Sequence, residues 1–85
     1  MEIKAAVRAF VVDNFYVADS SKLSDEVSLL LQGIVDSTGV LEVVIFLEQT
    51  YGIQVKDEDL IPENLDSIAK IGRFVERKLA SAASA

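Results

Sequence analysis

The sequence DSTGVLEVVIFLEQTYG, at residues 36–52, decides the fold. Its centre is rich in β-branched and aromatic residues, and these would also suit a buried strand. A helix accounts for more of the stretch, because apolar residues recur at helical spacing from Val40 to Tyr51. Gly52 follows at once, and glycine is typical of the position just past a helix end. We therefore predict a helix from Thr38 to Tyr51.

Upstream of this stretch, residues 2–17 have the pattern of an amphipathic helix, with apolar residues every three or four positions. The polar residues 19–22 break that pattern. For residues 23–35 we expect a long loop with one helical turn, anchored by Leu30 and Ile34. A short helix over the same residues is the alternative.

Downstream, an extended link at residues 52–55 precedes a short acidic helical turn that Pro62 limits. Either Asp66 or Ser67 is expected to cap a last helix. The inner row of this helix is Ile68, Ile71, Val75 and Leu79. The small residues 81–85 are expected to form a flexible tail, which leaves a single domain over residues 1–80.

The predicted fold is all-α: a small bundle of three main helices plus a short one, with a long loop between the first two. The expected core consists of the apolar residues that share the inner helical rows, with the two loop anchors beside them. These residues are Ile3, Val7, Phe10, Val44, Leu47, Ile53, Ile68, Ile71 and Val75, with Leu30 and Ile34.

The composition argues against several classes of protein. The 85 residues include no Cys, His or Trp, so thiolate metal sites and the usual general base are missing, and we expect no catalytic residues. A net charge of −6 disfavours nucleic-acid binding. The sequence shows no signal peptide and no apolar run long enough to span a membrane, so we expect a cytoplasmic protein.

The acidic residues gather in the middle of the chain. Residues 36–66 hold eight acidic residues and one basic residue, a net charge of −7, whereas residues 67–85 have a net charge of +3. Such a surface either keeps the protein soluble or steers basic partners toward it. The acidic run at residues 57–59 lacks the alternating ligand spacing of an EF-hand, so we predict no specific metal site there.

The serine at position 37 allows three interpretations. Either Asp36 or Ser37 caps the following helix, which is a common use of such residues. A hydrolase nucleophile is poorly supported, because no histidine is present to activate the hydroxyl and the glycine spacing is not that of a nucleophile elbow. A serine at a helix start also suits modification by another enzyme, since a helix N-terminus favours a phosphate group.

The order of motifs around this serine resembles the acyl carrier protein family, and the resemblance spans essentially the whole chain. The motifs that carry it are Gly33-Ile34-x-Asp36-Ser37, Leu41-Glu42, Leu47-Glu48, Tyr51-Gly52-Ile53, Asp57-Glu58-Asp59 and Asn64-Leu65-Asp66-Ser67-Ile68. The most specific of them is Asp-Ser at the start of an acidic and apolar helix.

This resemblance implies that Ser37 carries 4′-phosphopantetheine, with Asp36 completing the signature. A phosphopantetheinyl transferase would attach the group from coenzyme A, and an acyl cargo, or a hydroxyacyl or aminoacyl one, would bind as a thioester. The implied partners are a loading ligase and a downstream acyltransferase or synthase with basic docking surfaces. The partner-binding residues implied for this chain, which is expected to be monomeric, are Leu41, Glu42, Ile45 and Glu48.

Three residues depart from the pattern usual in fatty-acid synthesis: Thr38, Gly39 and Gln49. They favour a specialised carrier, in a branch of lipid or secondary metabolism. For Gly39 two interpretations stay open, namely room for the prosthetic arm or a partner backbone, and a frayed helix start. Two alternative functions also remain: a peptidyl or aminoacyl carrier, and a helical interaction module without the prosthetic group.

Overall fold

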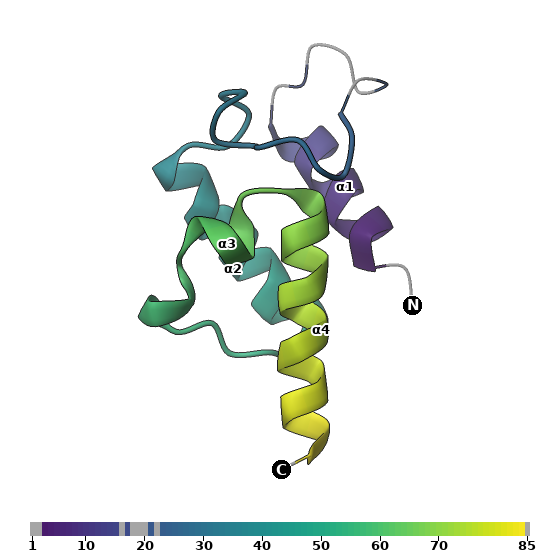
Figure 1. The fold of residues 1–85 in the computed structure, drawn as a ribbon, viewed down its shortest axis with the longest axis vertical. Coiled ribbons are helices and arrows are strands. Elements are labelled where there is room, and N and C mark those ends of the chain that lie inside the picture. Colours follow the sequence, from purple (N-terminus) through teal and green to yellow (C-terminus); the bar gives the residue numbers. More distant parts are fainter. Residues whose placement is uncertain (1–2, 16, 18–20, 22, 85) are drawn as a thin grey trace.

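Helices make up the framework of the computed structural model, which describes residues 3–15, 17, 21 and 23–84 (Figure 1). They follow in the order α1 (Ile3–Asn14), α2 (Ser37–Tyr51), the 3-10 turn η2 (Asp57–Asp59), α3 (Pro62–Leu65) and α4 (Ile68–Ser84). A long connection without an α-helix joins α1 to α2, and no strand occurs among the described residues. The predicted all-α bundle of three main helices and a short one is confirmed.

The helix ends follow local chemistry. Gly52 ends α2 in the left-handed conformation, with φ 68°, and its N–H donates to the carbonyl of Glu48. Ser67 caps α4, because its Oγ accepts the N–H of Lys70 at 3.1 Å. The first helix is shorter than predicted: it ends at Asn14, where the expected range ran to residue 17.

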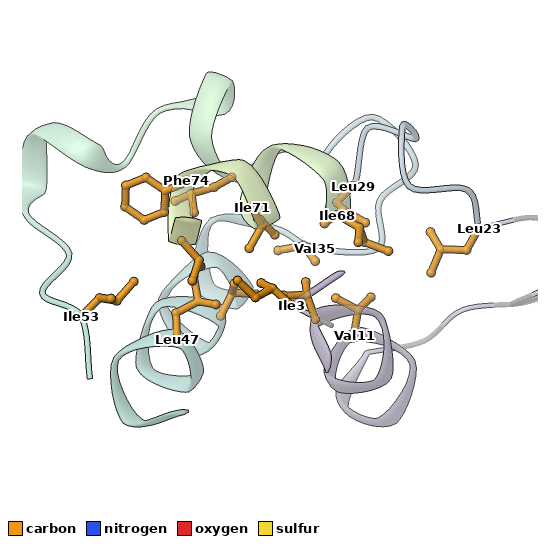
Figure 2. Packing of buried hydrophobic residues seen from close by; sticks show 14 residues of the cluster. Ile3, Val11, Leu23, Leu29, Val35, Leu47, Ile53, Ile68, Ile71 and Phe74 are labelled. Atoms are coloured by element: carbon orange, nitrogen blue, oxygen red, sulfur yellow. The ribbon is translucent and has the colours of Figure 1, made fainter. Parts of the chain in front are cut away.

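The core forms where α4 packs against α1, α2 and α3. Figure 2 shows labelled side chains of α1, α2 and α4 converging with those of the long loop. Seven of the predicted core residues are buried: Ile3, Val7, Leu47, Ile53, Ile68, Ile71 and Val75. Phe10, Ile34 and Val44 are partly buried and pack against this cluster.

The prediction that Leu30 anchors the loop is wrong, because its side chain is 41% exposed. Its neighbour Leu29 is buried instead, together with Val35. The carbonyl of Leu29 accepts the N–H groups of both Ile34, at 3.0 Å, and Val35, at 3.2 Å. These bonds close a turn without helical periodicity, so the helical spacing used for the prediction selects the wrong leucine.

The buried side chains of the last helix also differ from its predicted inner row. Phe74 was not predicted for the core, yet it is 2% exposed, whereas Leu79 is only partly buried. The helix continues to Ser84, into the segment expected to be a tail. A domain boundary at residue 80 stays a prediction.

The turn η2 is joined to α4 by an ion pair between Lys78 Nζ and Asp59 Oδ2 at 2.7 Å. Hydrogen bonding to Lys78, and then to the N–H of Lys56, lowers the pKa of Asp59 below its ordinary value. The contribution of Asp59 to stability is therefore present above the ordinary carboxyl pKa and is lost as the pH falls through the lowered one.

Removing the Lys78 charge should raise the pKa of Asp59. We expect Lys78→Gln to move the Asp59 titration midpoint upward, as measured by NMR of the carboxyl carbon. Lys70→Gln serves as a control, because Lys70 takes part in no ion pair among the described residues. An equal midpoint in the parent and Lys78→Gln would contradict this assignment.

Candidate functional site

The first turn of α2 presents Ser37 to solvent. Asp36 is the N-cap, with φ −99° and ψ −174°, and its Oδ1 accepts the N–H of Gly39 at 2.7 Å. Of the two predicted caps, the aspartate is therefore the one used. Ser37 is exposed, and within the described part of the chain its hydroxyl makes no hydrogen bond. Its oxygen is thus free for chemistry at the helix N-terminus.

An apolar groove of about 310 Å³ lies beside Ser37, between the start of α2 and the segment around α3. Apolar side chains from the long loop, α2 and residues 60–65 make most of its wall. The lining residues are Leu30, Ser37, Val40, Leu41, Leu60, Ile61, Pro62, Leu65 and Asp66. Sequence reasoning did not find this groove. The apolar run Leu60-Ile61-Pro62, just after the acidic turn, was the available signal.

Three of the predicted partner-binding residues lie on the outer surface of α2. Leu41 is 54% exposed and Ile45 is 52% exposed, and Glu42 is also exposed. Glu42 forms no ion pair among the described residues. The three side chains form an apolar surface with one free carboxylate on α2, and Leu41 also lines the groove at Ser37.

Glu48 is placed differently. It is half-buried, and its Oε2 accepts the N–H of Val55 at 3.0 Å. This carboxylate therefore fixes the extended link after α2. The structure does not test the predicted role of Glu48 in partner binding. An ion pair with a partner would compete with the hydrogen bond from Val55 for the Glu48 carboxylate.

Gly39 fits neither of its two predicted interpretations. It is buried in the first turn of α2, and its N–H is held by the cap, so the helix start is ordered. A Cβ at this position would lie 2.7 Å from Cε1 of Phe15 and 3.2 Å from Cγ1 of Val35. The space around Gly39 is taken by the protein's own core, and glycine allows the Phe15 ring to approach the helix backbone.

Gly39→Ala should therefore destabilise the protein by about 1 kcal/mol, because overpacking outweighs the gain in helix propensity. Urea denaturation would measure the loss. In a Phe15→Leu background the cost should fall, since the ring that meets the new Cβ is gone. A stabilised Gly39→Ala protein, or an unchanged cost in that background, would contradict this packing.

The sequence also led us to expect no metal site and no membrane-spanning segment. The described part of the chain contains no group of three His, Cys, Asp or Glu residues that could hold a metal ion. In the acidic run at residues 57–59, the Asp59 carboxylate already binds Lys78 and the N–H of Lys56. None of the helices described is long and apolar enough to cross a membrane.

The residues around Ser37 fit a phosphopantetheine group. The hydroxyl is exposed and unbonded, the N-terminus of a helix favours the negative charge of a phosphodiester, and an apolar groove begins at the same residue. Among the described residues, Asp66 is the only charged one that lines the groove, and both oxygens of its carboxylate are already hydrogen-bonded to the long loop.

The chain is similar to carrier proteins in sequence and in fold. No profile of a known protein family matches the chain. The D-alanyl carrier protein of Streptococcus pyogenes serotype M5 (strain Manfredo) is 31% identical over 64 residues, 75% of this chain and 80% of that protein. Its counterpart from serotype M1 gives the same values. The solution structure of a holo acyl carrier protein from Nitrosomonas europaea has a TM-score of 0.70 and 26% identity, covering 94% of this chain and 99% of that one.

The helical bundle and its likeness to the holo acyl carrier protein and to the D-alanyl carriers show that the chain is a carrier protein. With the similarity to the D-alanyl carriers, the chain belongs to the acyl carrier protein family. As a carrier it is not an enzyme.

Proposed function

We propose that this protein carries an acyl group as a thioester on 4′-phosphopantetheine attached to Ser37, and presents it to partner enzymes. The observation that supports this most is the exposed Ser37 hydroxyl, released from capping by Asp36 and placed at the mouth of an apolar groove. The prosthetic group supplies the thiol that the sequence lacks.

In this proposal the chain's own residues orient and present the attachment point. Asp36 fixes the first turn of α2 through the N–H of Gly39, and this holds the Ser37 side chain toward solvent. On attachment, Oγ of Ser37 loses its proton and bonds to the phosphate of the incoming phosphopantetheine, while the nucleotide part of coenzyme A leaves.

The proposed partners are a phosphopantetheinyl transferase, a loading ligase and a downstream acyltransferase or synthase. They would dock on the outer surface of α2 through Leu41, Glu42 and Ile45, where apolar contact adjoins a free carboxylate. Exposed ion pairs contribute only about 0.2–1 kcal/mol each, so docking should be transient and sensitive to salt. A cytoplasmic location and a monomeric state stay predictions.

The attachment is tested by incubating the protein with coenzyme A and a broad-specificity transferase, followed by intact-mass measurement. We expect a gain of one phosphopantetheine, which peptide mass spectrometry should place on Ser37. No gain, while a known carrier is modified in the same reaction, would overturn the proposal. The interaction module without a prosthetic group would then be favoured.

The cargo is a separate question, because the relatives named above are D-alanyl carriers, and this makes an aminoacyl carrier the second candidate. The groove favours an apolar acyl chain, since apolar residues make most of its wall. The transferase can be supplied with octanoyl-, acetyl- or D-alanyl-coenzyme A to load each group directly. The octanoyl form should have the highest melting temperature, whereas an advantage of the D-alanyl form would favour the aminoacyl carrier.

A further inference from the structure

Asp66, between α3 and α4, binds the long loop through three hydrogen bonds. Its carbonyl accepts the N–H of Leu29 at 2.7 Å. Its Oδ2 accepts the hydroxyl of Ser28 at 2.7 Å, and its Oδ1 accepts the N–H of Leu30 at 3.0 Å. Asp66 is not needed to cap α4, because Ser67 does so. Its carboxylate therefore acts on the loop alone.

The bound loop residues lead directly to the attachment site. Leu30 forms part of the groove beside Ser37, although it is 41% exposed and has no place in the core. The next residue, Leu31, is 87% exposed, so apolar burial holds neither side chain firmly. Two hydrogen bonds hold the Leu30 backbone: its N–H donates to Asp66 Oδ1 at 3.0 Å, and its carbonyl accepts the N–H of Gly33 at 3.1 Å. Of the two, only the bond to Asp66 ties Leu30 to a segment outside the loop.

The rest of the loop has anchors that do not involve the Asp66 side chain. Leu29 is buried, and the carbonyl of Asp25 accepts the N–H of Ala69 at 2.9 Å. Arg8 also pairs with the Asp25 carboxylate at 2.7 Å. Loss of the Asp66 carboxylate should loosen Leu30, Ser28 and also Leu31, whose N–H donates to Ser28 Oγ at 3.1 Å. Leu29 should stay buried and the bundle should stay folded.

We propose that Asp66 is a positioning residue of the carrier site: its carboxylate fixes Leu30 as a wall of the groove beside Ser37 and so favours apolar cargo there. The cargo part rests on the proposed function, whereas the placement of the loop does not. Without the carboxylate, Leu30 is no longer held at the side of the groove, and the groove then covers less of an acyl chain.

Two variants separate positioning from general stability. Asp66→Ala removes both side-chain bonds. Asp66→Asn keeps an oxygen for the N–H of Leu30, and its amide nitrogen can donate to Ser28 Oγ. Asp57→Ala is the matched control, since Asp57 is an exposed aspartate whose side chain makes no hydrogen bond or ion pair among the described residues.

Amide hydrogen exchange of the unmodified proteins tests the loop. In Asp66→Ala, exchange at Leu30 and Leu31 should accelerate about tenfold or more, while Val43 and Leu47 inside α2 keep the rates of the parent. Asp66→Asn should restore slow exchange, and Asp57→Ala should match the parent. Unchanged exchange at Leu30, or an equal acceleration at every core amide, would overturn the proposal.

The groove is tested by the rise in melting temperature that octanoyl loading gives over acetyl loading. This rise should be largely lost in Asp66→Ala and kept in Asp66→Asn. If exchange accelerates at Leu30 but the rise is unchanged, Asp66 does not shape the groove and the proposal is wrong. If Ser37 accepts no prosthetic group, the proposed function fails, and hydrogen exchange alone decides whether Asp66 positions the loop.

Discussion

Ser37→Ala should take up no phosphopantetheine at all and yet unfold at the same urea concentration as the parent. The hydroxyl that it removes is exposed and makes no hydrogen bond within the described chain. Asp36 supplies the cap of α2 in both proteins. Substitutions at such exposed positions usually change stability by less than about 0.5 kcal/mol. The effect on modification should therefore be complete, with almost no effect on folding.

Thr38→Ala is the matched control, because it removes a neighbouring exposed hydroxyl from the same helical turn. This variant should be modified like the parent, as measured by intact mass. Modification of Ser37→Ala would show that another hydroxyl accepts the group, and loss of modification in Thr38→Ala as well would indicate a damaged recognition surface. The first result would contradict the assignment of Ser37 as the single attachment site, and the second would show that the loss in Ser37→Ala does not by itself identify the acceptor.

Phe74→Ala should have the largest effect on stability, a loss of about 3–5 kcal/mol. The ring is 2% exposed and belongs to the cluster that joins α4 to the rest of the bundle. Small domains have a total stability of only about 5–15 kcal/mol, so this single cavity should remove a large part of it. The shift in the urea midpoint at constant slope measures the loss.

Leu31→Ala provides the comparison, because it also truncates a large apolar side chain but one that is 87% exposed. Its unfolding should change by no more than about 0.5 kcal/mol. Similar losses in the two variants would mean that burial of Phe74 does not stabilise the bundle as the structure indicates.

The helical architecture could be predicted because it depends on local signals. Apolar residues keep helical spacing over residues 40–51, a stretch longer than most strands. Gly52 then ends the helix in a left-handed conformation that glycine adopts freely. The Asp-Ser pair at the helix start pointed to Ser37 as the proposed attachment site, and the structure leaves Ser37 exposed there. These features need only residues within a few positions of one another.

The errors fall where distant residues decide the outcome. Helical spacing selected Leu30 as the loop anchor, whereas the structure buries Leu29, whose N–H bonds to the carbonyl of Asp66 more than thirty positions later. Gly39 appeared to be a weak point of a helix, because nothing local indicates that the Phe15 ring packs against it. Phe74 stands three positions after Ile71, a spacing that could have placed it in the core.

The amino-acid sequence by itself determined the helices, the acidic middle of the chain and the identity of the serine, because periodicity, charge and capping act over short distances. Only the tertiary structure decided which structural role each of the residues around that serine has. Asp66 binds the loop instead of capping its own helix, and Leu30 lines a groove instead of filling the core. These roles follow from hydrogen bonds between segments far apart in the chain, which exist only once the bundle has packed.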